Sequence, residues 1–387
     1  MKKQVPLGEM TPEQFLRDYW QKKPLLIRNA IPDFEPLLSA DELAGLACEQ
    51  DVESRLIRFD AQGDTWTLDK GPFDESHFAN LPQRCWTLLV QAVDHWLPEA
   101  TELVDKFNFI PNWRVDDLMI SYAVDGGGVG PHYDNYDVFL LQAEGTRRWE
   151  IGGICDEHSP RREDAPVMIL PQWEAEQSFE LNPGDMLYLP PQVAHNGVAI
   201  GDGCVTYSIG FRAPAHNEIL RSFSDFIGEQ LGREQRYADA DLTLQDNPGQ
   251  ISAAALSRVA DILASYLGNR EQLASWFGQY MTEPKYPELV EEGEQLEESD
   301  IAEALAEGCS IRRAEGSRFA YIDRDADSVL LFADGQQHEA EGEAAALARH
   351  ICRERGLDAA QVPTQSSTAL SLLKTLLQNG CCYLTEG

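Results

Sequence analysis

Short apolar runs separated by turn residues dominate the middle of the chain, from about residue 117 to residue 213. Gly, Pro and Asp interrupt these runs, several of which are rich in β-branched and aromatic residues. Many short, regularly spaced strands are typical of a sandwich or barrel. The predicted strands are LMISYAV, YDVFLLQA, RRWEIGG, SFEL, DMLYLP and CVTYSIGFRA.

The pattern on either side of this region is different. Residues 11–30 predict a helix capped by Thr11 and then a strand at PLLIRNA, while residues 40–50 and 83–97 have the spacing of amphipathic helices. After Pro214 apolar residues recur at intervals of three and four, which predicts further helices.

The C-terminal third contains an acidic segment and a small α+β unit. The acidic segment carries two prolines and is predicted to be a linker. In the α+β unit, SRFAYIDR and SVLLFADG predict a hairpin, and STALSLLKTLLQNG predicts a helix ending at Gly380. The element order resembles a winged helix. The predicted division of the chain is therefore 1–215, 216–282, 283–300 and 301–387.

The charge balance limits the kinds of partner. The chain has 387 residues, with 65 Asp and Glu against 31 Lys and Arg, and its formal net charge is -34. Such a field repels nucleic acid and anionic membranes and favours basic partners, although solubility alone also explains it. Because residues 301–387 are acidic too, we expect no DNA binding by the winged-helix-like unit.

Cysteine usage and hydropathy indicate the compartment. The eight cysteines are scattered and form no CxxC pair, so we expect reduced thiols. No apolar run approaches the length of a membrane span, and no secretory pattern follows the first lysines. These features favour a cytoplasmic protein.

A candidate metal centre lies in GGGVGPHYDNYDVF, residues 126–139. If this segment is a strand, His132 and Asp134 project to one face, together with Tyr136. An imidazole beside a carboxylate suits a divalent first-row metal, and a third ligand would complete a facial triad. His195, which ends NPGDMLYLPPQVAH, supplies that ligand. The His132 and Asp134 pair alone would be an ordinary surface feature, and His195 alone would be weak evidence. Together the three residues predict a metal site.

The same motifs carry a family resemblance. G-x-H-x-D followed by G-x5-P-x4-H resembles the cupin-type, double-stranded β-helix oxygenases of the JmjC class. Within that class the chain looks like the bacterial ribosomal oxygenases, the 50S ribosomal protein arginine 3-hydroxylase family. DDLMISYAVDGGGVGPHYDNYDVFLLQ and DMLYLPPQVAHNGVA carry the likeness, which covers residues 10–215 well.

The resemblance implies an α+β fold and a defined chemistry. The fold would be a double-stranded β-helix catalytic domain, then a helical dimerisation region and a small winged-helix-like domain. The cofactor would be Fe(II) held by His132, Asp134 and His195, with 2-oxoglutarate and O2 as co-substrates.

A fixed cation should hold the far carboxylate of 2-oxoglutarate. Alternation places Arg147 with Trp149 on the inward, apolar face and Arg148 on the other, so Arg147 is the predicted partner. The family also places a basic residue at this position. Ser121 is a second candidate contact to 2-oxoglutarate.

The resemblance also implies a pocket for a substrate arginine. Asp117, Met119 and Tyr136 match that pocket, and Ser208 could add a hydrogen bond. Hydroxylation would fall on the β-carbon of an arginine in a basic large-subunit ribosomal protein. The helices of 216–282 carry more apolar residues than a small bundle buries, which predicts a homodimer.

Two alternatives remain open on the sequence. The same chemistry could act on a histidine or an N-methyl-lysine, although a carboxylate at Asp117 favours arginine over histidine. A metal-binding cupin without catalysis, serving as a sensor or scaffold, is the other alternative. An inward-facing Arg147 argues against it, because a scaffold has no use for a buried cation beside the metal.

Overall fold

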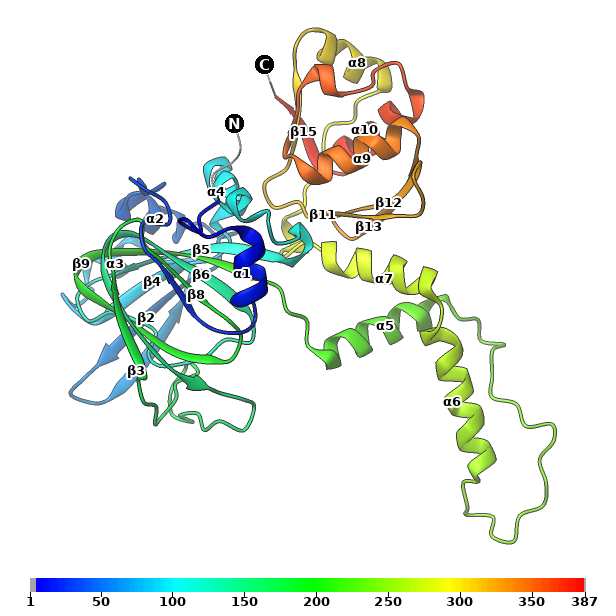
Figure 1. Ribbon diagram of the computed structural model, residues 1–387, viewed down its shortest axis with the longest axis horizontal. Helices are drawn as coiled ribbons and strands as arrows, with labels where there is room; N and C mark the ends of the chain where they lie inside the picture. The colour runs from blue at the N-terminus through cyan, green and yellow to red at the C-terminus, as the bar shows by residue number, and fades with distance from the viewer. Residues whose placement is uncertain (1–4, 386–387) are drawn as a thin grey trace. The chain divides into compact units, whose positions relative to one another are not determined.

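The computed structural model describes residues 5–385 and divides between Ala213 and Pro214 into two compact units. Figure 1 shows the elements of each. The finer division of the second unit remains a prediction.

The first unit is built on one antiparallel sheet that confirms the predicted cupin architecture. Its strand order is β1-β8-β6-β9-β5-β4-β2-β3, with β7 paired to β6. The strands are β1 Leu25–Ile27, β2 Ser54–Asp60, β3 Thr65–Lys70, β4 Trp86–Val90, β5 Val115–Ala123, β6 Asp137–Ile154, β7 Gln177–Leu181, β8 Met186–Leu189 and β9 Val193–Phe211. The helices are α1 Pro12–Asp18, α2 Ala40–Leu46, α3 Glu75–Ala79 and α4 Pro98–Val104, with 3-10 turns at Val93–His95, Asp105–Phe107 and Asn112–Arg114.

Two long strands replace several of the predicted short ones. β6 and β9 pair over most of their length, with irregular register near Glu144. Gly145 has φ +65°, and a Cβ there would lie 2.7 Å from the carbonyl oxygen of Gly203. Because only glycine fits this approach, the strands pass through the irregularity as continuous elements.

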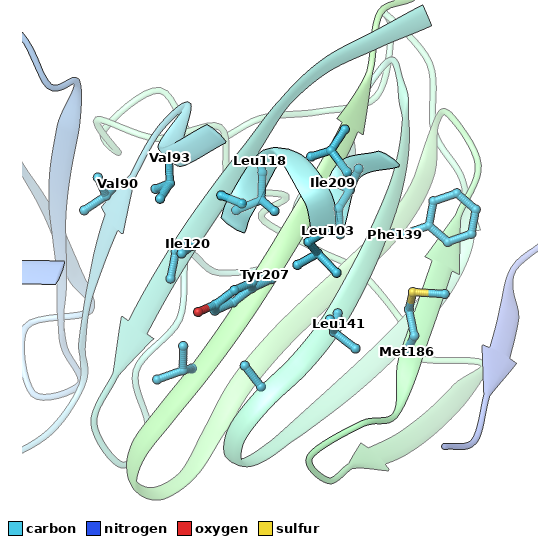
Figure 2. Packing of buried hydrophobic residues seen from close by; sticks show 14 of the residues in the cluster. Val90, Val93, Leu103, Leu118, Ile120, Phe139, Leu141, Met186, Tyr207 and Ile209 are labelled. Atoms are coloured by element: carbon cyan, nitrogen blue, oxygen red, sulfur yellow. The ribbon is translucent and has the colours of Figure 1, made fainter. Parts of the chain in front are cut away.

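Alternation along β6 separates the core from a cavity on the other face. Phe139 and Leu141 belong to the main core with Phe15 of α1 and Leu103 of α4, whereas neighbouring residues of β6 line the cavity described below. Figure 2 shows Phe139, Leu141 and their neighbours in this core. The helices thus cover one face of the sheet and leave the other for chemistry.

Two predictions about local structure were wrong. Residues 83–97 form strand β4 and a short 3-10 turn, because WTLLV pairs with both β2 and β5, and Ala92 follows in the left-handed region at φ 51°. The segment from His132 to Tyr136 is not a regular strand; His132 forms only an isolated bridge with His195. The Thr11 cap of α1 is confirmed.

The second unit begins with three helices and ends in the predicted small α+β fold. The helices are α5 His216–Gln230, α6 Ala253–Leu267, α7 Arg270–Thr282, α8 Glu298–Ala306, α9 Glu343–Arg353 and α10 Ser367–Gln378, with 3-10 turns at Pro287–Leu289 and Ala359–Gln361. Two three-stranded sheets have the orders β14-β10-β15 and β11-β12-β13. Their strands are β10 Ser310–Arg313, β11 Phe319–Asp323, β12 Ser328–Ala333, β13 Gln336–Glu341, β14 Gly356–Leu357 and β15 Cys382–Thr385.

Details of this unit confirm some predictions and refine one. The β11–β12 hairpin is present, and Gly380 follows α10 with φ +72°. The acidic segment is not a free tether: Gly293 donates its N–H to the Gln378 carbonyl, and α8 begins inside the segment at Glu298.

The cysteines and the helices bear on two predictions, that the thiols are reduced and that no segment spans a membrane. All eight cysteines carry free thiols. Within residues 5–385, every helix is too short or too polar to cross a bilayer.

The aromatic cluster around Phe139 generates a stability prediction. Its ring centroid lies 4.9 Å from those of Phe107 and Tyr188, and the side chain is fully buried. Phe139→Ala should lower the free energy of unfolding of the first unit by about 3–5 kcal/mol through lost burial and a residual cavity. Urea denaturation measures this. Leu244→Ala, at a fully exposed position, should change it little; equal effects would contradict the packing described.

Candidate functional site

Three potential metal ligands converge where β6 and β9 begin. Asp134 Oδ2 lies 3.9 Å from His132 Nε2 and 3.6 Å from His195 Nε2. One ligand atom from each of the three residues lies within 4.8 Å of the others. A single ion can therefore contact all three.

Backbone pairing brings the two histidines together. The His132 N–H donates to the His195 carbonyl at 2.9 Å, and the His195 N–H donates to the His132 carbonyl at 2.8 Å. The preceding glycines permit this approach: a Cβ on Gly128 would lie 2.3 Å from the carbonyl oxygen of Gly197, and one on Gly127 2.1 Å from that of Trp86. The glycine-rich stretch thus lies flat against neighbouring strands.

Both imidazoles are oriented for coordination. Nδ1 of His132 lies 2.8 Å from the Gly130 carbonyl oxygen, and Nδ1 of His195 lies 2.9 Å from that of Val193. A carbonyl can only accept, so each Nδ1 is the donor and each Nε2 keeps its lone pair. Burial lowers the pKa of His195 to about 4, with a contribution from His132 that exceeds the opposing effect of Asp134. His195 is therefore neutral at pH 7, as a metal ligand must be.

A cavity of about 350 Å³ opens beside these ligands. Its wall comes from β2 to β6, from β9 and from the loop between β6 and β7. The wall combines apolar side chains with polar and charged ones. Its lining includes His132, Asp134, His195, Arg147, Trp149, Ser121, Met119, Tyr136, Ser208, Thr206, Arg55, Val138 and Leu140.

Arg147 faces this cavity, as alternation predicts. It is 4% exposed, whereas the side chain of Arg148 is 43% exposed and its Nε lies 3.7 Å from Glu150 Oε1. Two nitrogens of the Arg147 guanidinium, Nε and Nη2, are buried without a hydrogen-bond partner in the described part of the chain. Burying such donors costs free energy unless an acceptor satisfies them, so the cavity suits a carboxylate.

Of the other five predicted site residues, four line the cavity and one does not. Ser121, Met119, Tyr136 and Ser208 line the cavity, but Asp117 does not. Between Val115 and Leu118 the pairing of β5 with β9 is irregular, so simple alternation does not carry Asp117 onto the face of Met119.

Charged groups nevertheless surround Tyr136. Desolvation raises the pKa of its hydroxyl, and the carboxylates of Asp134 and Asp117 add to the effect, while Arg55 opposes it. Asp117 thus influences Tyr136 electrostatically, although its carboxylate is buried and does not line the cavity.

Sequence reasoning missed two polar residues next to this site. Arg55 lines the cavity, and Gln91 donates to Asp117. Gln91 lies in the segment predicted as a helix, where no spacing connects it to the metal motif. Its one signal is its position directly after the apolar run WTLLV, at the end of a strand.

Family models match most of the chain. A model of the JmjC domain matches residues 102–219, and a model of the ROXA-like winged helix matches residues 261–383. A model of an AraC-like ligand binding domain matches residues 173–270. The winged-helix match confirms the fold predicted for the C-terminal part.

Relatives that match most of the chain are ribosomal oxygenases and hydroxylases. The chain is 34% identical over 326 residues to the Escherichia coli ribosomal protein uL16 3-hydroxylase, covering 84% of each chain. It is 33% identical to a probable ribosomal oxygenase of Haemophilus influenzae, covering 84% of this chain and 82% of that one. A structure of the E. coli ribosomal oxygenase YcfD in complex with cobalt and 2-oxoglutarate matches with a TM-score of 0.86 at 30% identity, covering 97% and 99% of the two chains.

The ligand geometry predicts how a variant binds metal. His195→Ala should weaken Co(II) binding by at least about 100-fold, since loss of a partner outside the ligand shell already costs 10–100-fold. Isothermal titration calorimetry measures the affinity. His158→Ala, an exposed histidine, is the matched control and should bind like the unmodified protein. Similar affinities for both variants would exclude His195 as a ligand.

Proposed function

The chain belongs to the family of bacterial JmjC ribosomal oxygenases, and from this premise we propose that it hydroxylates the β-carbon of an arginine in a basic large-subunit ribosomal protein. The reaction uses Fe(II), 2-oxoglutarate and O2. The observation that carries the proposal is a two-histidine, one-carboxylate cluster and a buried, unsatisfied Arg147 in the same cavity.

The donor set fits ferrous iron. Two imidazoles and one carboxylate form the facial triad typical of non-haem Fe(II) oxygenases and leave coordination positions open. We assign His132, Asp134 and His195 as the ligands. When bound, the iron with 2-oxoglutarate and O2 supplies the oxidising power to hydroxylate an unactivated C–H bond. The Nδ1 hydrogen bonds of both histidines hold the rings in place for this task.

We assign Arg147 to the far carboxylate of 2-oxoglutarate. Its two unsatisfied guanidinium nitrogens can take a carboxylate through two parallel hydrogen bonds. The Trp149 ring centroid lies 5.6 Å from the guanidinium carbon and helps to fix the cation. Ser121, which lines the same cavity, offers a second contact.

We assign the target arginine to the part of the cavity near Tyr136. Met119 and the Tyr136 ring pack its aliphatic stem, and the Ser208 hydroxyl accepts a hydrogen bond from its guanidinium. The buried Asp117 carboxylate, which does not line the cavity, supplies a favourable negative charge. The apolar wall of Val138 and Leu140 excludes water from the reacting carbon.

A homodimer is part of the proposal. α6 has no buried residue, and it exposes Leu256, Val259, Leu263 and Leu267 along one face. An apolar helix face of this kind is stable in water only when another surface covers it. A second copy of the same helix is self-complementary and covers it symmetrically. Because its proposed substrate is a ribosomal protein, we propose a cytoplasmic location for the dimer.

Co-substrate turnover tests the proposed reaction. Incubation with Fe(II), ascorbate, 2-oxoglutarate and an arginine-containing peptide of ribosomal protein uL16 should add one oxygen atom to the arginine. Arg147→Met should abolish turnover through lost 2-oxoglutarate binding, whereas Arg148→Met should retain it. Mass spectrometry of the peptide and of succinate measures both. An unmodified peptide with the intact protein, or equal loss in both variants, would contradict the proposal.

Light scattering tests the dimer. Leu263→Glu places a charge in the centre of the exposed α6 face and should shift the mass from dimer to monomer. Ser265→Glu is the matched control, since it adds the same charge on the opposite side of the helix and should leave the dimer intact. A monomeric intact protein, or dimers in both variants, would contradict this interface.

A further inference from the structure

A chain of hydrogen bonds connects the cavity wall to Asp117. An Nη2 of Arg55 donates to Gln91 Oε1 at 2.9 Å, and Gln91 Nε2 donates to Asp117 Oδ2 at 2.6 Å. Asp117 is 3% exposed. Arg55 lines the cavity but Gln91 does not, so Gln91 reaches the substrate region only through its neighbours.

The chemistry of Arg55 and Asp117 determines which way the Gln91 amide points between them. A guanidinium has only donors, so the oxygen of the Gln91 amide must face Arg55. The amide nitrogen then faces Asp117, whose ionised carboxylate is purely an acceptor. The amide cannot flip without breaking both bonds. Arg55 therefore holds Gln91 in the orientation that presents an N–H to Asp117.

The backbone next to Gln91 supports the same arrangement. Ala92 has φ 51°, a conformation that residues other than glycine rarely adopt. In this conformation its N–H donates to the same Asp117 oxygen at 3.0 Å. Two donors on one oxygen fix the plane of the carboxylate, and backbone strain is retained where the surrounding structure requires it.

We propose that Gln91 and Arg55 are positioning residues that hold the buried Asp117 carboxylate in one orientation, so that its charge favours a cationic target side chain. The inference rests on the proposed function. Asp117 contributes specificity only if its carboxylate keeps one position, because the Coulombic attraction of a cation depends on the distance to the charge. Gln91 and Arg55 therefore determine how strongly the site prefers a cationic side chain, and Gln91 does so from outside the cavity.

The experiment compares variants of the Gln91 link. Gln91→Met removes both hydrogen bonds at similar volume and should raise the KM for the uL16 arginine peptide about tenfold, as expected for loss of a charged hydrogen bond. The KM for 2-oxoglutarate and the peptide-independent turnover should stay within about twofold of the unmodified protein, since a folding defect would change all three.

Arg55→Met should act in the same direction, and Arg58→Met is its matched control. Arg58 lies on the same strand, does not line this cavity and pairs with Asp69. Its substitution should leave the peptide KM unchanged. Thermal unfolding of each variant checks that the fold is intact.

A double substitution isolates the route of the effect. In an Asp117→Asn background, Gln91→Met should add no further increase in peptide KM, because both changes remove the same interaction. Independent, multiplicative losses would overturn the inference, as would an unchanged peptide KM for Gln91→Met alone. If the unmodified protein leaves the peptide unhydroxylated, the proposed function and this inference both fail; if it hydroxylates the peptide, failure of the variants concerns the inference alone.

Discussion

The antiparallel bridge between His132 and His195 is the constraint on which the site depends. Two residues far apart in sequence exchange both backbone hydrogen bonds, and this places their imidazole centroids 4.2 Å apart. The bridge is sterically possible because Gly127 and Gly128 have no side chain. A Cβ on either residue would clash with neighbouring backbone. Asp134 is held at the same point by the Gln192 N–H, which donates to its carbonyl. The convergence of the three potential ligands thus depends on backbone pairing.

The charge states of His195 and Arg147 match the ligands that the cavity is proposed to bind. His195 is buried and neutral, which leaves Nε2 free to bind a cation. Arg147 is buried and positive, although the protein carries a net charge of -34. An isolated buried guanidinium is costly, which supports the proposal that the carboxylate of 2-oxoglutarate binds Arg147. The acidic surface has two explanations, solubility and attraction of a basic ribosomal protein, and the second is consistent with the proposed substrate.

Much of this site could be predicted from the sequence, because its groups lie in motifs or obey alternation. The two histidines and Asp134 belong to spaced motifs, and Arg147 follows from the inward face of β6. Other features depend on tertiary pairing. WTLLV fits a strand or a buried helix equally well, and pairing with β2 and β5 decides it. Met119 lines the cavity and Asp117 does not, because the pairing of β5 with β9 is irregular between Val115 and Leu118. No residue type in the sequence indicates this irregularity. Gln91 contacts Asp117 only after β4 has formed, so no local pattern connects them.

The most direct measurement is anomalous X-ray diffraction from crystals of the protein loaded with cobalt. One strong peak is expected about 2.0–2.2 Å from Nε2 of His132, Nε2 of His195 and a carboxylate oxygen of Asp134, as for first-row metals on these ligands. A peak elsewhere, or one from which any of the three atoms lies more than about 3 Å away, would contradict it.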